Sequence, residues 1–279
     1  RLEGKKILLD QNEQHSMTWK AVLGQAGFKH DALVKKICLK LESPTMDDNV
    51  ADHERLYQAI MMKQGIELNV MQTGYSILKK LPSVLRENDW TVTVTLGHRG
   101  RVLEIIDVQP GDTSSNNYGV AIDVGTTTVV ACLLELETSK VVDSEAVYNT
   151  QMKFGEDYIQ RIMYAMQNDT LDEMQRSIVA DINKLISTLV ERNSIKLDDI
   201  TSIVCAGNTA MHHFLLGLDP ERIRKEPYIP TANFIPPIRA IQLGIDINSR
   251  GLLYTLPSVA AYVGADITSG AAAIRLDKE

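Results

Sequence analysis

The sequence predicts an α/β protein, with a small α+β unit followed by a larger unit built on a mixed sheet. Three observations support this fold class. The alternating segment WTVTVTL at 90–96 predicts a strand, and apolar residues at helical spacing over 171–193 predict a long amphipathic helix. The stretch QPGDTSSNN at 109–117 is rich in turn residues and separates the two units. A chain of 279 residues has room for two such domains.

The bulk composition narrows the class of protein. Hydrophobic residues make up 44% and charged residues 23% of the chain, as in ordinary globular proteins. The net charge is −7 and the Lys and Arg residues are scattered, so we expect no nucleic-acid partner. No apolar run approaches the ~20 residues of a membrane span, and the N-terminal RLEGKKILLDQNEQ has no signal-peptide pattern. We therefore expect no membrane partner and a cytoplasmic location.

The cysteines argue against a metal cluster on this chain. Cys38, Cys132 and Cys205 are far apart in sequence and odd in number, so a disulfide framework is not expected. Iron–sulfur clusters usually need four thiolates, several of them closely spaced. We expect no such cluster here. Because the sequence does not begin with Met, we also expect a fragment of a longer protein.

The first unit is predicted from short alternations and helical repeats. Residues 1–30 are polar, and we interpret them as a linker with a short helix over 16–27. Residues 31–112 are expected to form the small α+β middle domain. Its predicted strands are 34–41, 90–96 and 101–108, the last two joined by a turn at 97–100, and its predicted helices are 52–62 and 76–85.

The second unit is predicted to begin at Tyr118 and to extend to residue 279. Its first strands are expected to form a β-meander over 118–124, 129–137 and 141–148. The predicted elements that follow are helices at 155–167 and 171–193, a strand at 200–206, a helix at 210–216, a loop-like region at 219–251 and a small-residue helix after residue 264.

The sharpest motif is IDVGTTT at 122–128, between two predicted strands. A phosphate tail needs backbone N–H groups turned toward it, and Gly125 lets the chain turn without a Cβ in the way. Hydroxyl donors follow at Thr126, Thr127 and Thr128. Asp123 is placed to hold Mg²⁺, directly or through water, because Mg²⁺ prefers carboxylate and water oxygens. The competing interpretation is a plain hairpin turn with Thr chosen for strand propensity.

Two further turns carry candidate site residues. GADITSGAAA at 264–273 places Gly264 and Asp266 at a helix start, where the carboxylate could orient an attacking water or hold the metal. We therefore group Asp266 with Asp123 as candidate catalytic residues. The alternative for this segment is close helix packing through its small residues.

AGNTAMHH at 206–213 directly follows a predicted strand. Gly207, Asn208 and Thr209 are expected to form a polar turn facing the cleft, with Asn208 or Thr209 as the helix N-cap. The adjacent His212 and His213 would point in different directions on a helix and make a poor metal pair, so we interpret them as surface or core histidines.

The strand–turn–strand setting of IDVGTTT resembles the first phosphate loop of the actin, Hsp70 and sugar-kinase superfamily, which has an RNase H-like fold. The chain as a whole resembles the ATP-dependent reductive activators of corrinoid enzymes. The resemblance covers roughly residues 30–279. It is carried by KLESPTMDDNVADHERL (40–56), YGVAIDVGTTTVV (118–130), YNTQMKFGEDYIQRI (148–162), AGNTAMHHFLLGLDP (206–220), EPYIP (226–230) and LPSVAAYVGADITSG (256–270).

This resemblance implies a function. The family's ferredoxin-like [2Fe–2S] domain receives a low-potential electron, and the activator reduces a Co(II) corrinoid to Co(I) with the help of ATP and Mg²⁺. The implied partners are a corrinoid protein or corrinoid methyltransferase component and a second copy in a homodimer. The resemblance assigns the first phosphate loop to Asp123, Gly125, Thr126 and Thr127. It assigns the second phosphate loop to Gly264 and Asp266.

This sequence departs from the family's pattern at both ends. The ferredoxin cysteines are absent, and the second lobe with the adenosine-binding loop should follow Glu279. We therefore expect an incomplete ATPase domain that is inactive by itself. Two other functions stay open: a sugar-kinase-class phosphotransferase, and a nucleotide-gated binding scaffold without redox chemistry. Between the two loops Glu156 and Asp157 are polar, but they do not make a convincing sugar site.

Overall fold

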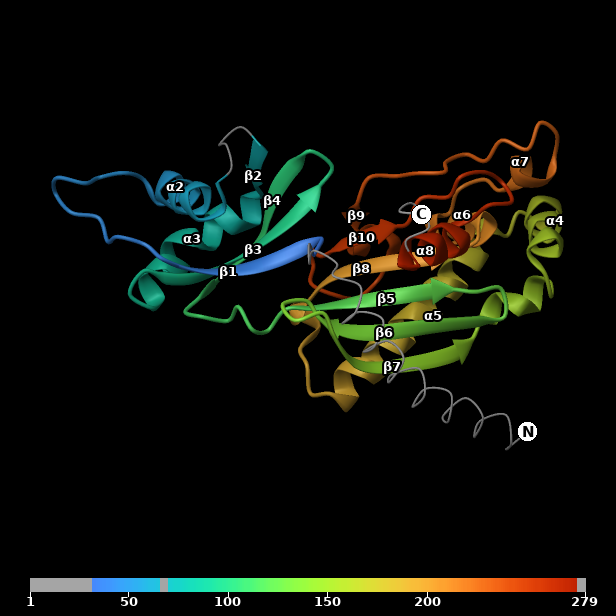
Figure 1. Ribbon diagram of the computed structural model, residues 1–279, viewed down its shortest axis with the longest axis horizontal. Coiled ribbons are helices and arrows are strands. Elements are labelled where there is room, and N and C mark those ends of the chain that lie inside the picture. Colours follow the sequence, from blue (N-terminus) through green and yellow to red (C-terminus); the bar gives the residue numbers. More distant parts are fainter. Residues whose placement is uncertain (1–31, 66–69, 275–279) are drawn as a thin grey trace.

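The computed structural model describes residues 32–65 and 70–274, which form two sheets with their helices (Figure 1). The proposed linker at 1–30, with the helix predicted at 16–27, lies outside these residues. The α/β class with an α+β unit in front is confirmed. Within the described ranges, no helix is long and apolar enough to cross a membrane.

The first unit is a four-stranded sheet with two helices. Strand order is β1-β3-β4-β2, with β3 antiparallel to both β1 and β4, and β2 parallel to β4. The strands are β1 (Val34–Lys40), β2 (Met71–Thr73), β3 (Thr91–Arg99) and β4 (Val102–Pro110), and the helices are α2 (Asp52–Gln64) and α3 (Tyr75–Glu87). The apolar faces of both helices share a core with the sheet. Strand β2 was not predicted, because three residues are too few to show an alternation.

The second unit is a six-stranded mixed sheet in the order β7-β6-β5-β8-β10-β9. Its first three strands form the predicted antiparallel meander, and β8 and β10 continue the sheet parallel to β5. The strands are β5 (Tyr118–Val124), β6 (Thr128–Glu135), β7 (Lys140–Tyr148), β8 (Ile200–Gly207), β9 (Ile238–Arg239) and β10 (Leu252–Thr255). The chain first forms the meander β5-β6-β7 and then crosses over, so that β8 lies beside β5 and β10 beside β8.

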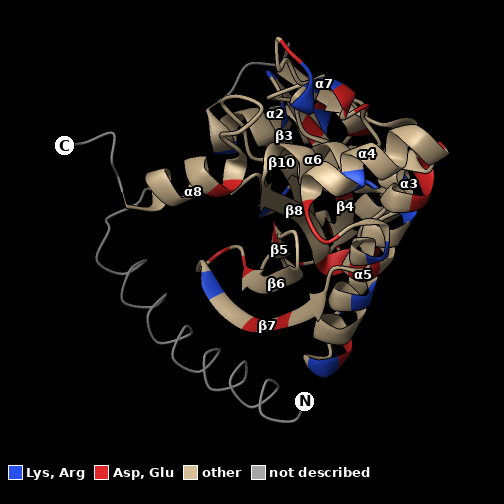
Figure 2. Ribbon diagram, turned by 90° about the vertical axis from the view of Figure 1, so that its right-hand side faces the viewer, with Lys and Arg blue, Asp and Glu red and all other residues tan. Residues whose placement is uncertain are grey.

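Helices cover the two faces of this sheet unequally. The helices are α4 (Tyr158–Asn168), α5 (Leu171–Arg192), α6 (Thr209–Leu216), α7 (Glu221–Arg224) and α8 (Ala265–Ala273). Helix α5 packs its apolar stripe, which includes Met174, Ile178 and Ile182, against β6 and β7. Helix α8 contacts β8, and Figure 2 shows it on the side of β5 and β6 opposite to α5.

The helix predicted at 155–167 begins later than expected. A 3₁₀ helix covers Thr150–Phe154, and Gly155 follows with φ 157°, a backbone conformation that favours glycine. The Asp157 carboxylate then accepts a hydrogen bond from the Gln160 N–H at 2.8 Å and caps α4. The capping group, not the periodicity, sets the start of the helix.

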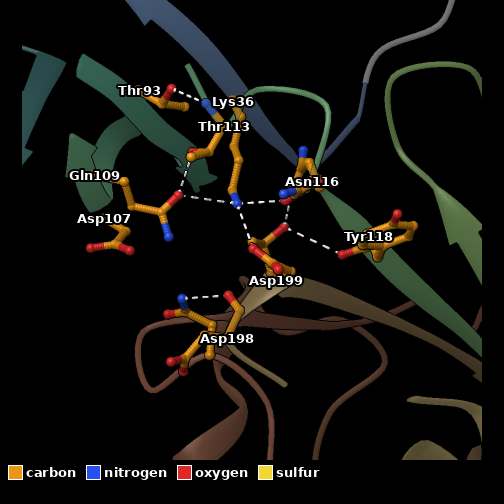
Figure 3. Close-up of polar contacts among 12 residues, drawn as sticks. Lys36, Thr93, Asp107, Gln109, Thr113, Asn116, Tyr118, Asp198 and Asp199 are labelled. Atoms are coloured by element: carbon orange, nitrogen blue, oxygen red, sulfur yellow. Dashed lines mark hydrogen bonds and ion pairs between the residues drawn. The ribbon is translucent and has the colours of Figure 1, made fainter. Parts of the chain in front are cut away.

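Buried polar contacts join the two units. Figure 3 shows the Lys36 ammonium between the Gln109 side chain, the Asn116 carbonyl and the Asp199 carboxylate, which is 3.0 Å away. The Asn117 side chain bridges from the Val34 carbonyl of β1 to the Thr201 hydroxyl of β8. Next to these contacts, Val34, Ile106 and Leu252 form a small apolar cluster across the same boundary.

Candidate phosphate-binding site

The turn between β5 and β6 is tight and has no room for a side chain at its glycine. A Cβ placed on Gly125 would lie 2.5 Å from the Thr128 carbonyl oxygen, a contact that real Cβ atoms do not make. Asp123, two residues earlier in β5, has an exposed side chain, whereas its neighbours Ile122 and Val124 are buried in the core. The strand alternation therefore turns Asp123 away from the core and toward the face that carries α8.

The carbonyl groups of the β5–β6 turn accept hydrogen bonds from two residues, Asn149 and Arg161. The Asn149 side chain donates to the Gly125 carbonyl at 2.8 Å, and its backbone N–H donates to the Thr127 carbonyl at 2.9 Å. The Arg161 guanidinium donates to the Thr126 carbonyl at 2.6 Å. In a trans peptide the N–H points opposite to the C=O. These bonds therefore turn the N–H groups of Thr126, Thr127 and the following residue to the other side, as an anion-binding nest requires.

A second turn lies beside the first, at the carboxyl end of β8. Gly207 has φ 157°, and a Cβ there would lie 2.8 Å from the Val124 carbonyl oxygen. The Asn208 side chain caps α6 by accepting from the Met211 N–H at 2.9 Å, as predicted, and its Nδ2 lies 3.3 Å from the Thr126 hydroxyl. Asn208 therefore links the first two turns directly.

The third turn closes on the second. A Cβ on Gly264 would lie 2.4 Å from the Asn208 Cα and 2.8 Å from the Thr209 nitrogen. Asp266 follows in the first turn of α8, where its Oδ1 accepts from the Ile267 N–H at 2.9 Å. The three glycine turns, distant in sequence, therefore meet at one edge of the sheet.

The negative charges of the two candidate carboxylates, Asp123 and Asp266, repel each other. Although part of its side chain is exposed, Asp123 is partly desolvated by the surrounding protein, which raises its pKa, and the negative charge of Asp266 raises that pKa further. Both acids line one groove of about 580 Å³ on the sheet face opposite α5. Apart from the acids and two serines, its lining is mainly apolar and includes Ile122, Val130 and Val204. Two carboxylates that repel each other are stabilised by a cation between them.

These residues fit a metal–phosphate group better than a bare metal ion. Within the described ranges, no group of three or more His, Cys, Asp or Glu side chains could hold a metal. Mg²⁺ usually takes one or two protein carboxylates and completes its shell with water and substrate phosphates. Helices α6 and α8 also begin at this edge, and their N-terminal N–H groups favour an anion.

Other candidate residues have different surroundings. The Thr209 side chain is buried, and its hydroxyl donates to the Ala260 carbonyl at 2.8 Å. Thr127 is exposed on the turn, and Thr128 opens β6. His212 and His213 are both buried, in agreement with the core interpretation.

Sequence reasoning did not single out two residues that support the site. Asn149 and Arg161 hold the carbonyl groups of the first turn, but they lie 24 and 35 residues further along the chain. Both lie in YNTQMKFGEDYIQRI, which carried part of the family resemblance, so that segment was the available signal.

The fold and the turns define a class of protein. A three-strand meander, two parallel strands on its inner side and glycine turns at the shared edge form a lobe with the actin/Hsp70-like fold. The family model of the RACo middle region matches residues 118–279, and that of the RACo linker region matches residues 24–115. The chain belongs to the RACo family.

Two relatives show the extent of the similarity. "Corrinoid activation enzyme RamQ" of Eubacterium limosum is 27% identical over 227 residues, which cover 80% of this chain and 37% of that protein. The solved structure "Reductive activator for corrinoid,iron-sulfur protein" is 37% identical and superposes with a TM-score of 0.85 over 91% of this chain and 40% of that chain. This chain spans about two fifths of the length of these relatives.

Proposed function

We propose that this chain supplies the phosphate-binding lobe, and the small α+β unit in front of it, of an ATP-dependent activator of corrinoid proteins. In this function a Co(II) corrinoid accepts one electron and becomes Co(I). The electron would come from a [2Fe–2S] domain outside these residues. The partner is a corrinoid protein or a corrinoid methyltransferase component, and the activator works as a homodimer in the cytoplasm.

One observation carries the proposal. Asp123 and Asp266 line the same groove beside a turn whose carbonyl groups are all held from behind. That arrangement offers N–H donors to phosphate oxygens and carboxylates to Mg²⁺ or its waters. The names of the two relatives supply the corrinoid partner, because both describe corrinoid activation.

ATP has a physical reason to be part of this function. Reduction of Co(II) to Co(I) is uphill, and a nucleotide can shift a partner's state only if it favours one complex over another. Mg-ATP binding would provide such a difference, because the cation relieves the repulsion between Asp123 and Asp266. The residues of this chain would therefore change the affinity for the corrinoid protein and its conformation. The electron would pass through the [2Fe–2S] domain outside these residues.

The alternatives are less well supported by the groove. A sugar-kinase-class phosphotransferase needs polar groups that recognise sugar hydroxyls, whereas most residues that line the groove are apolar. A nucleotide-gated scaffold needs the same phosphate site as the activator. The two functions differ only in whether the cobalt of the bound corrinoid protein is reduced. The experiment below separates all three functions.

The test compares Asp123→Ala with wild type in the full-length protein. Thermal unfolding is followed with and without Mg-ATP, and reduction of a Co(II) corrinoid protein is followed anaerobically by its absorbance. We expect Asp123→Ala to reduce ATP-dependent reduction on the order of 10²-fold, as for loss of a preorganised electrostatic group. The melting temperature without nucleotide should change little, because the exposed carboxylate contributes repulsion and no packing. Asp246→Ala, an exposed acid away from the site, is the control.

Each outcome has one interpretation. A variant with the full nucleotide-induced shift and full activity would show that Asp123 is only a turn residue. Phosphoryl transfer from labelled ATP to a sugar without any corrinoid protein would favour the kinase. Nucleotide-dependent binding of the corrinoid protein with no change at cobalt would favour the scaffold.

A further inference from the structure

Arg161 is the largest fully buried side chain among the described residues. It projects from the first turns of α4, and its relative exposure is 0%. Arginine is rarely buried to this extent unless a carboxylate pairs with it. The position of this cation behind the phosphate turn therefore calls for an explanation.

Its hydrogen bonds connect three segments around that turn. The guanidinium donates to the Thr126 carbonyl at 2.6 Å and to the Gly155 carbonyl at 2.9 Å. Its third contact is the Met211 sulfur in α6, at 3.5 Å. Helix α6 is capped by Asn208, whose side chain reaches the Thr126 hydroxyl. Arg161 thus touches the turn and the helix that lies beside it.

The charge of Arg161 has no paired carboxylate. None of the ion pairs among the described residues involves it. Burial lowers its pKa, which the negative charge of Asp157 only partly offsets. A buried cation that is bonded only to carbonyl groups and a sulfur is costly in the free protein. The same cation would be stabilised by an anion bound on the far side of the turn.

We propose that Arg161 is the positioning residue of the phosphate turn. Its bond to the Thr126 carbonyl fixes the peptide plane that presents the next N–H to the phosphate, and its charge supplies a counterion for the triphosphate. It does so without touching the ligand, because the turn lies between them. The residue therefore acts on nucleotide affinity through the turn, and its effect requires the phosphates.

The inference rests on the proposed phosphate site, and the experiment separates the two. In the full-length protein, Arg161→Met removes the charge and the donors at similar volume, and Arg161→Lys keeps the charge without the planar fork. Arg176→Met is the matched control, because Arg176 is exposed on α5 and donates only to the Asp172 carbonyl of its own helix. The measurements are the Kd for Mg-ATP, the melting temperature without nucleotide, and KM for ATP against kcat.

We expect Arg161→Met to raise the Kd and KM for Mg-ATP by roughly tenfold to a hundredfold, the range for charge-assisted hydrogen bonds. Arg161→Lys should recover part of this loss, and Arg176→Met should match wild type. The nucleotide-free melting temperature should change by no more than a few degrees, because removal of a costly buried charge offsets the lost bonds.

Several results would contradict the role of Arg161. Wild-type Kd in Arg161→Met would exclude it, as would a large loss of nucleotide-free stability with the nucleotide-induced shift intact. If Arg161→Met does not fold, Arg161→Lys decides, because wild-type affinity in that variant would contradict the proposed positioning of the Thr126 carbonyl by the planar guanidinium. Absence of Mg-ATP binding in the wild type would instead contradict the phosphate site itself.

Discussion

At the scale of single residues, the site consists of groups whose surroundings disfavour their charged forms. Asp123 faces Asp266, which lies about 140 residues further along the chain, and the pKa of Asp123 is raised by burial and by that second acid. Arg161 lies on the other side of the turn without a paired carboxylate. Such groups cost stability in the free protein, and at the proposed site they would contribute favourably to the binding of Mg²⁺ and phosphate.

His212 gives this scale a pH-dependent prediction. Its ring is buried beside the Gly207 turn, and burial, followed by the charge of His213, lowers its pKa to about 4. An unfolded histidine takes up its proton near pH 6.5, whereas folded His212 does so only near pH 4. Between these values the unfolded chain binds more protons, so stability falls as the pH falls through this window.

We expect His212→Gln to remove part of this acid sensitivity. At pH 5 the contribution is on the order of 2 kcal/mol, from about 1.5 pH units of differential protonation. The measurement is the free energy of unfolding at pH 7.5 and pH 5 for the wild type and the variant. His98→Gln is the control, because His98 is exposed on β3. An unchanged difference between the two pH values in His212→Gln would contradict the assignment.

At the scale of elements, two strand ends and the start of one helix build the site. The β5–β6 turn, the β8–α6 turn and the start of α8 contact one another through glycines that leave no room for a Cβ. Each turn contributes one polar side chain to this edge, namely Asp123, Asn208 and Asp266. The close approach of three backbones is therefore what brings these side chains together.

Gly264→Ala tests this close approach. The new Cβ would meet the backbone of Asn208 and Thr209, so the start of α8 must move away from α6. We expect a loss of roughly 1–3 kcal/mol in the free energy of unfolding, as for other overpacked sites, and a smaller melting-temperature shift with Mg-ATP. The φ of Gly264 is −84°, so the effect would come from the clash and not from backbone strain.

Gly270→Ala in the same helix is the matched control. A Cβ there has no atom within 4 Å, and alanine in place of glycine stabilises a helix interior by roughly 0.5–1 kcal/mol. Both variants are measured by urea unfolding and by the nucleotide-induced shift. Equal effects at the two positions would show that the contact between α8 and the β8–α6 turn is unimportant.

At the scale of the whole molecule, the two units are joined by polar contacts and a small apolar cluster. The Lys36 side chain is 1% exposed and pairs with Asp199, directly before β8. Near the same boundary, the buried Glu104 of β4 pairs with Arg239 and Arg250 of the second unit. Because β8 ends at the proposed phosphate site, the first unit is tied to the strand that carries Gly207 and leads into Asn208.

The Lys36–Asp199 pair predicts strong coupling between the two residues. Asp199→Asn leaves the Lys36 charge buried and unpaired, so we expect a loss of roughly 3 kcal/mol in the free energy of unfolding. Lys36→Met alone should also destabilise, whereas the double variant should lose less than the sum of the two. Denaturant unfolding of the four proteins gives the coupling energy. Additive losses would show that the ion pair does not hold the two units together.

The sequence alone determined the class of fold and most of its elements. The meander, the long amphipathic α5 and the strands β1, β3 and β4 of the first unit follow from local alternation and helical repeats, which depend only on which residues face a core. The turn motif IDVGTTT was also readable, because a glycine between two strands and a run of Thr is a local signal. The capping role of Asn208 was likewise visible in AGNTAMHH.

Only the tertiary structure decided what surrounds these motifs. Strand β2, the late start of α4 and the bonds of Asn149 and Arg161 to the phosphate turn depend on partners distant in the chain. The same holds for the meeting of Asp123 with Asp266 and for the buried pair of Lys36 and Asp199. Propensity and periodicity describe each segment by itself, whereas burial and charge pairing arise only when the sheet order brings separate segments to one edge.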